Sequence, residues 1–230
     1  MKNLPKHSGK EDRFDLQHPN DALSQHLITL YWWGELSIDD PTSLISRFFK
    51  NAPDVVRRHA IDYAGRSIWN AKDAVPKEVL DRLQHLFDIR LKSAKESGSP
   101  KEYLLELAAF EPWVYSLKFD ELWTLHTLKE VLILTRNDKQ HKGYILEPLS
   151  KLSERHPLEA VKCLKLLIES TAEQSSWHGN PVKIKAILRN AMSAEDETAK
   201  QIVVEVKDYL LRQGQFEFRN LEDKGGSPDR

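Results

Sequence analysis

Apolar residues recur three and four positions apart along most of this chain, and a proline stands near the start of many of these runs. Such spacing gathers apolar side chains on one face of an α-helix. Proline is tolerated in the first turn of a helix, because an N–H at that position has no partner within the helix. The pattern therefore predicts an all-α fold. The prolines concerned are Pro19, Pro41, Pro53, Pro76, Pro100, Pro157 and Pro181.

Three of these runs define the expected inward faces of their helices. The run after Pro76 is regular, with Val79, Leu83 and Leu86 on the inward side. The same spacing assigns an inward face to each of the helices after Pro41 and Pro53. The expected inward residues are Leu44, Ile45, Phe48 and Phe49 in the first, and Val56, His59, Ala60, Tyr63 and Ser67 in the second.

The ends of several helices carry their own signals. Gly34 and Gly214 are expected to stop the helices that precede them, because glycine accepts the left-handed conformation found there. Ser193 is expected to cap the last helix, and Pro112 to kink or end the helix that it interrupts. Residues 215–219 alternate apolar and polar side chains, but no partner strand exists, so we expect an extended tail packed on the last helix pair.

Helix pairs recur along the chain at a regular interval. First helices would begin near Pro53, Pro100, Gly143 and Pro181, and second helices 14 to 23 residues later, so that the repeat is about 38 to 47 residues. HEAT and armadillo repeats have periods of roughly 40 to 47 residues. The sequence thus predicts an α-solenoid of antiparallel helix pairs (HEAT-like) with about nine or ten helices. An irregular helical bundle without true repeats is the alternative.

Particular residues carry a resemblance to known families. Over about residues 41–214 the helix pairs, the prolines near helix starts and the cluster of Asp54, Arg57 and Arg58 resemble HEAT and armadillo repeats. The runs 119–123, 156–164 and 216–221 resemble the C-terminal helical region of large bacterial proteins with an ATP-binding or other effector domain upstream, some of them linked to phage defence. This resemblance implies a sensor or scaffold portion without its effector, and no P-loop is present.

The chain ends and the cysteine content suggest how the chain is organised and where it acts. Residues 1–17 and 222–230 are polar and are expected to be flexible tails around a single helical-repeat domain at 18–221. No run approaches the roughly 20 apolar residues that span a bilayer, so we expect no membrane partner. The only cysteine, Cys163, excludes an intramolecular disulfide. These features favour a cytoplasmic protein.

Catalytic and metal-binding patterns are weak. None of the nine histidines forms the i, i+4 pair that binds zinc on a helix together with an intervening Glu. Cys163 falls within an apolar helix, where a packed and unreactive thiol is expected. The acidic pair Asp39 and Asp40 and the acidic run 195–197 precede or begin helices, where carboxylates favour the helix dipole. We therefore expect no enzyme activity, no metal and no cofactor.

Three aromatic residues in succession, Tyr31, Trp32 and Trp33, are the first candidate binding surface. Neighbours on a helix point about 100° apart, so one buried face cannot take all three. At least one tryptophan is expected to reach the surface or a packing boundary. A partner or a missing N-terminal domain would dock there; the alternative is a core wrapped all round by later helices.

Two basic groups are the second candidate. Arg57, Arg58 and Arg66 share a helix, and their spacing places Arg58 and Arg66 on roughly the same side. Ordinary solvated faces are the default interpretation of both groups. If their helices line a concave side, they would form a groove for an anionic partner. The second group consists of Lys162, Lys165, Lys183, Lys185 and Arg189.

The leading functional hypothesis is a non-catalytic interaction or scaffold module that binds a protein partner, with Tyr31, Trp32 and Trp33 and the basic residues as contacts. The alternative is a nucleic-acid-binding HEAT-like repeat similar to those of DNA repair. The formal net charge of −1 argues against it, because phosphate neutralisation supplies most nucleic-acid affinity. A small-molecule enzyme on a helical bundle is a weaker third possibility, since no site for it is evident.

Overall fold

The computed structural model describes residues 19–97, 100–135, 145–170 and 180–221, and every regular element in these ranges is helical. The prediction of an all-α fold is therefore confirmed. The tails expected at 1–17 and 222–230 lie outside the described residues. The elements are, in chain order, α1 (Pro19–Trp32), α2 (Leu44–Asn51), α3 (Asp54–Asn70), α4 (Lys77–Glu96), the 3-10 helix η1 (Pro100–Tyr103), α5 (Leu104–Ala108), α6 (Glu111–Ser116), α7 (Glu121–Leu134), α8 (Leu146–Leu152), α9 (Pro157–Ser170), α10 (Pro181–Ser193), α11 (Glu197–Arg212) and the 3-10 helix η4 (Phe216–Phe218).

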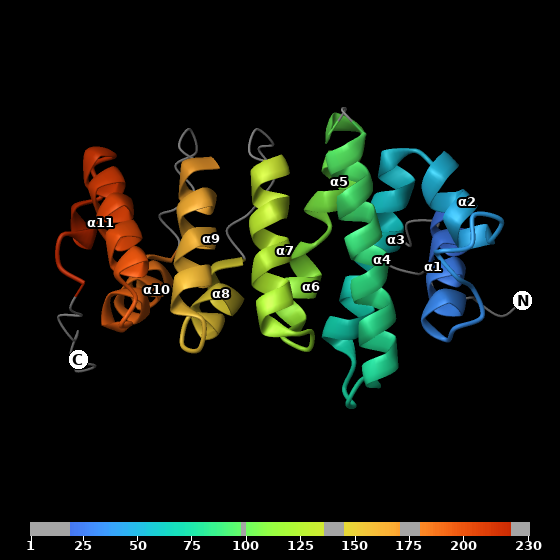
Figure 1. The fold of residues 1–230 in the computed structure, drawn as a ribbon, viewed down its shortest axis with the longest axis horizontal. Coiled ribbons are helices and arrows are strands. Elements are labelled where there is room, and N and C mark those ends of the chain that lie inside the picture. Colours follow the sequence, from blue (N-terminus) through green and yellow to red (C-terminus); the bar gives the residue numbers. More distant parts are fainter. Residues whose placement is uncertain (1–18, 98–99, 136–144, 171–179, 222–230) are drawn as a thin grey trace, which may run out of the picture.

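The helices stand side by side in chain order, with α1 near one end of the long axis and α11 at the other (Figure 1). Two series of contacts run along the molecule. In one series α1 packs on α3, α3 on α6, α6 on α8, and α8 on α10. In the other α4 packs on α7, α7 on α9, and α9 on α11. Each helix thus buries an apolar face against its neighbours in the row, which no single helix pair achieves alone.

The helix ends agree with the sequence at two glycines and differ at the last helix. Gly34 and Gly214 adopt positive φ values of 84° and 80° just after α1 and α11, as expected for helix stops. Ser193 does not cap α11, because it is the last residue of α10. Asp196 is the cap, and its carboxylate accepts the backbone N–H of Ala199 at 3.0 Å.

The helix expected to begin near Pro100, with a kink or an end at Pro112, is divided into η1, α5 and α6. Asp54 on α3 causes part of this break, since its carboxylate accepts the backbone N–H groups of Leu105 and Glu106 at 3.0 Å each. This side chain caps a new helix start from outside the segment. Pro112 stands in the first turn of α6 and has no N–H to continue the preceding helix.

A buried ion cluster fixes the position of α5. The carboxylate of Glu106 is fully buried and accepts Nε of Arg57 on α3 and Nε of Arg90 on α4, both at 2.6 Å. The Arg90 guanidinium also lies 5.0 Å from the ring centre of Phe49, and both guanidiniums lie over Tyr103. These charges are paired and hydrogen-bonded, as buried ions must be.

The buried face of α3 is rotated from the face expected from the sequence. His59, expected inward, is exposed, whereas Arg57 and Ile61 are buried. The shift brings Gly65 against Trp113 of α6: a Cβ at position 65 would lie 2.5 Å from that indole ring. The indole Nε1–H donates to the carbonyl of Ile61 at 2.9 Å. Close packing between α3 and α6, and not the apolar spacing of α3 alone, therefore determines which face of α3 is buried.

Two smaller expectations also need correction. Leu44, expected inward on α2, is 59% exposed, because this helix buries Ile45 and Phe49 instead. Residues 215–219 are not extended, since Phe216–Phe218 form the 3-10 helix η4. Packing of this segment on the last helix pair is confirmed, because η4 contacts α10 and α11 and Phe218 is buried.

Candidate functional site

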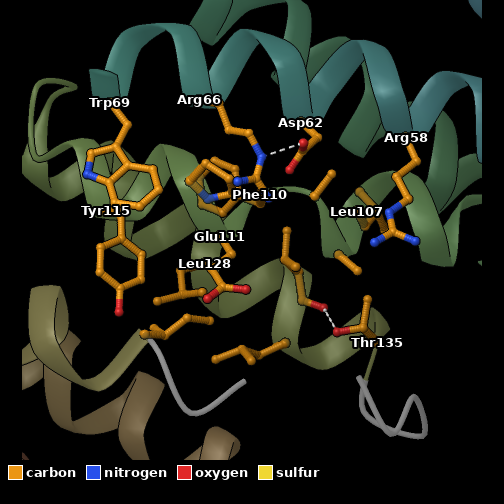
Figure 2. A pocket seen from close by; sticks show the side chains of 16 residues that line it. Arg58, Asp62, Arg66, Trp69, Leu107, Phe110, Glu111, Tyr115, Leu128 and Thr135 are labelled. Atoms are coloured by element: carbon orange, nitrogen blue, oxygen red, sulfur yellow. Dashed lines mark hydrogen bonds and ion pairs between the residues drawn. The ribbon is translucent and has the colours of Figure 1, made fainter. Parts of the chain in front are cut away.

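A pocket of about 680 Å³ opens where α3, α5, α6 and α7 meet. Figure 2 shows α3 along one side of it, with side chains of α6 and α7 opposite. This volume lies within the usual range of roughly 300–1,000 Å³ for sites that bind small ligands or anchor side chains. We call it the α3–α7 pocket.

One wall consists of a stripe of side chains on α3. Arg58, Asp62, Arg66 and Trp69 are spaced four, four and three residues apart, which places them in one row on the helix. Nε of Arg66 donates to the Asp62 carboxylate at 2.6 Å. Arg58 forms no ion pair with any described residue and is exposed. The stripe thus offers one guanidinium whose charge is compensated and one whose charge is not.

The opposite wall comes from α6. Pro112 and Tyr115 line the pocket with Glu111. The Tyr115 ring lies 5.4 Å from the ring of Trp69, centre to centre, at an interplanar angle of 40°. The two rings therefore close one end of the pocket, while Arg58 stands toward the other end (Figure 2).

Apolar side chains form the floor. The floor residues are Leu107, Phe110, Leu128, Val131, Leu132 and Ile145. Contact with such a surface favours an apolar group from a ligand.

Glu111 is the titratable group with the most unusual surroundings in the pocket. The pKa of its carboxyl is raised to about 7, chiefly because the carboxyl is buried; Arg66 opposes this shift, and Asp62 adds a smaller contribution to it. The carboxyl forms no hydrogen bond and no ion pair within 4 Å to the described part of the chain. Near neutral pH it therefore exists in both protonation states, so the net charge of the pocket depends on pH.

The pocket lacks the arrangements that metal or nucleophilic chemistry requires. Across the described ranges, no group of three or more His, Cys, Asp or Glu side chains is placed to hold a metal ion. Cys163 lies elsewhere and is buried, and burial raises the pKa of its thiol to about 12. The groups present are an apolar floor, two aromatic rings, two guanidiniums and two carboxyls, which suit recognition of a ligand.

The three aromatic residues expected as a binding surface separate in the structure. Tyr31 is buried, and its hydroxyl donates to the carbonyl of Arg82 at 2.7 Å. Trp32 is partly buried and stacks on Tyr63 with ring centres 5.9 Å apart. Trp33 is 65% exposed. The expectation that at least one tryptophan reaches the surface is confirmed, and only Trp33 offers a free ring face there.

The three arginines of the first basic group also have different surroundings, one in the core and two at the pocket. Arg57 is buried in the ion cluster described above, so it is not part of an exposed basic face. Arg58 and Arg66 line the α3–α7 pocket together, which agrees with the sequence-based placement on one side of the helix. Sequence spacing could not reveal the burial of Arg57, because its buried partner Glu106 comes from another helix.

The second basic group lies on α9 and α10 and is largely neutralised. Lys183 pairs with Glu147 at 2.6 Å, and Lys165 pairs with Glu205 at 2.6 Å. Lys162 pairs with Glu159 at 2.8 Å. Lys185 and Arg189 are half-buried on α10, where the Arg189 Nε–H donates to the Lys185 carbonyl. No member of this group lines the α3–α7 pocket.

Sequence analysis did not single out Asp62, Trp69 or Glu111, which line the pocket beside Arg58 and Arg66. Asp62 and Trp69 continue the row begun by Arg58 and Arg66, so helical spacing alone could have identified them. Glu111 gave no such signal, because it is the first residue of α6, and the break that separates α6 from α5 depends on tertiary contacts.

Comparison of the chain with protein-family models, with curated proteins and with solved structures finds no match. A search of the described helices for candidate membrane spans finds none of sufficient length and apolar character.

Proposed function

We propose that this chain is a HEAT-like α-solenoid that acts as a non-catalytic interaction module and binds a protein partner at the α3–α7 pocket. The two series of helix contacts, α1–α3–α6–α8–α10 and α4–α7–α9–α11, support the solenoid arrangement. In such a row each repeat contacts only its neighbours, and an extended surface stays available for binding.

The observation that carries the proposal is the composition of the pocket rim. Trp69, Tyr115, Arg58 and Arg66 surround an apolar depression. Tryptophan, tyrosine and arginine dominate the energetics of protein interfaces, above all where they surround a pocket that excludes water. Trp69 is 44% exposed, so part of its ring is available for a partner.

Trp33 is proposed as a second contact. It follows α1 directly, and its ring is among the most exposed large apolar groups of the described residues. Tyr31 and Trp32 contact the rest of the fold instead: the Tyr31 hydroxyl donates to the Arg82 carbonyl, and the Trp32 ring stacks on Tyr63. An effector domain on another chain, as the family resemblance implies, is one kind of partner that this surface would serve.

A protein partner is favoured over nucleic acid by the charges of α9 and α10. Lys162, Lys165 and Lys183 each pair with a carboxylate within 2.8 Å. These pairs leave little uncompensated positive charge for phosphates, and the formal net charge is −1. A gel-shift titration at low salt tests this directly, and tight binding of duplex DNA or RNA would favour the nucleic-acid alternative.

Site-specific photo-cross-linking in cells of the source organism tests the proposed docking site. The photoreactive residue p-benzoylphenylalanine replaces Trp69 in one variant and Val204 in the other. These positions form a matched pair, because the native side chains are 44% and 45% exposed and lie on α3 and α11 respectively. Both variants should keep the helical circular dichroism of the wild type.

The proposal predicts a discrete cross-linked protein for position 69 and not for position 204. Adding Ala108→Trp, which fills the pocket from α5, should remove that product. Equal products from both positions, or no product at position 69, would argue against a docking function of the pocket.

A further inference from the structure

We infer that the α3–α7 pocket receives an acidic, apolar segment of the partner, in which a bulky apolar side chain enters the pocket and a neighbouring carboxylate pairs with Arg58. This inference rests on the proposed function, because it names the chemistry of the segment that docks there. The argument depends on the pocket floor, on the distribution of charge along α3, and on the state of Glu111.

The apolar floor of the pocket indicates that the segment carries a bulky apolar side chain. The buried floor residues of α5 and α7 present only carbon atoms, and Trp69 and Tyr115 add two ring faces. Neither a charged nor a strongly polar side chain would regain its lost hydration on such a floor. A bulky apolar side chain would bury its surface there and contribute favourably to binding, at about 25 cal/mol for each Å² removed from water.

The charges along α3 indicate that the segment carries a carboxylate. Arg66 is neutralised by Asp62 at 2.6 Å, so this pair presents little net charge to a ligand. The guanidinium of Arg58 lacks an ion partner among the described residues and stands beside Leu107 at one end of the pocket (Figure 2). Arginine binds a carboxylate through two parallel N–H donors, which gives strength and direction. The charge that complements this end of the pocket is therefore negative.

The protonation state of Glu111 is compatible with a negatively charged segment in the pocket. Its carboxyl faces Asp62 and Arg66 across the pocket, and burial raises its pKa to about 7. In its protonated state it adds no negative charge that would repel an acidic segment, and its O–H can donate a hydrogen bond to a backbone carbonyl of that segment. A basic segment would instead need the ionised form of Glu111, which burial disfavours.

Peptide titration of the full chain tests the inference without knowledge of the partner. Three acetylated, amidated pentapeptides carry a central phenylalanine flanked on both sides by aspartate, by asparagine or by lysine. Binding is followed through the indole N–H resonance of Trp69 in the ¹⁵N-labelled protein, with the resonance of Trp33 as an internal reference outside the pocket. This readout detects dissociation constants in the millimolar range.

The aspartate peptide should shift the Trp69 resonance and bind about fivefold more tightly than the asparagine peptide, with the lysine peptide weakest. In Arg58→Gln the aspartate and asparagine peptides should bind equally. Arg47→Gln is the matched control, because Arg47 is also an exposed arginine on a helix but does not line the pocket. It should retain the fivefold preference.

The inference is overturned if the asparagine or lysine peptide binds as tightly as the aspartate peptide, if Arg58→Gln keeps the preference, or if none of the peptides shifts the Trp69 resonance. These results are distinct from failure of the proposed function. A cross-linked partner at position 69 without a preference for the aspartate peptide would overturn the acidic segment alone. Absence of both would overturn the docking site as well.

Discussion

Replacing Glu106 by glutamine should destabilise the chain more than any single surface change, because it removes the carboxylate that bridges two buried arginines. The Glu106 side chain is 0% exposed and accepts three hydrogen bonds from guanidinium groups. Two come from Arg90, at 2.6 and 3.2 Å, and one from Arg57, at 2.6 Å. The amide of glutamine keeps the shape but loses the charge, and it directs N–H donors toward groups that are themselves donors.

The magnitude follows from these bonds. Hydrogen bonds to charged groups each contribute about 1.5–3 kcal/mol, and at least one such bond is lost in the glutamine variant. The Arg90 guanidinium would also remain buried without a counter-charge, and Arg57 would keep only the Asp54 carboxylate, at 3.6 Å. Removing one partner of a buried ion pair costs about 3–5 kcal/mol, so we expect a loss of this size. Domains of ordinary stability unfold with about 5–15 kcal/mol, so a substantial part of the total would disappear.

Urea denaturation followed by circular dichroism and tryptophan fluorescence measures this loss. The midpoint for Glu106→Gln should fall by on the order of 1–2 M relative to the wild type. Glu96→Gln is the matched control, because the Glu96 side chain is 66% exposed and lies 3.9 Å from Lys92; it should change stability by less than about 0.5 kcal/mol. A loss below about 1 kcal/mol for Glu106→Gln would refute the account of the ion cluster.

Three further predictions concern Glu111, Gly65 and Cys163. Burial raises the Glu111 pKa from 4.5 to about 7, so the folded chain holds a proton that the unfolded chain releases, and stability falls as pH rises through this window. Glu111→Gln should therefore exceed the wild type in stability near pH 8 by up to about 3 kcal/mol and match it near pH 4 in urea titrations; equal stability at both pH values would contradict the shift. Gly65→Ala should lower stability by about 2 kcal/mol despite its better helix propensity, because the new Cβ would meet the Trp113 indole at 2.5 Å; a gain in the urea midpoint would count against that packing. Burial raises the Cys163 pKa to about 12, so a thiol reagent such as Ellman's reagent should label it only as the chain opens; rapid labelling of the folded chain would disprove its burial.

The helices could be predicted from sequence because their signals are local. Apolar spacing and the prolines identified the helical segments, and Gly34 and Gly214 marked two helix ends through their tolerance of positive φ. The same reasoning placed Arg58 and Arg66 on one side of a helix, which is how they line the pocket. In each case three or four residues of one helix contain all the information that is needed.

The rest of the site depends on contacts between distant residues. Asp54 starts α5 by accepting the N–H groups of Leu105 and Glu106, about fifty positions away. Arg57 is buried because Glu106 neutralises it, although its own helix gives no sign of burial. The break of the segment from Pro100 into η1, α5 and α6, whose residues line part of the pocket, therefore follows from tertiary contacts that no local pattern contains.

The affinity of the cross-linked partner, once purified, provides the most direct measurement of the central claim that the pocket is the docking site. Isothermal titration calorimetry would compare the wild type with Ala108→Trp, in which an indole side chain occupies the pocket, and with Val204→Ala on the distant helix α11. The account predicts at least about a tenfold weaker affinity for Ala108→Trp and no change for Val204→Ala. An unchanged dissociation constant for a folded Ala108→Trp chain would contradict it.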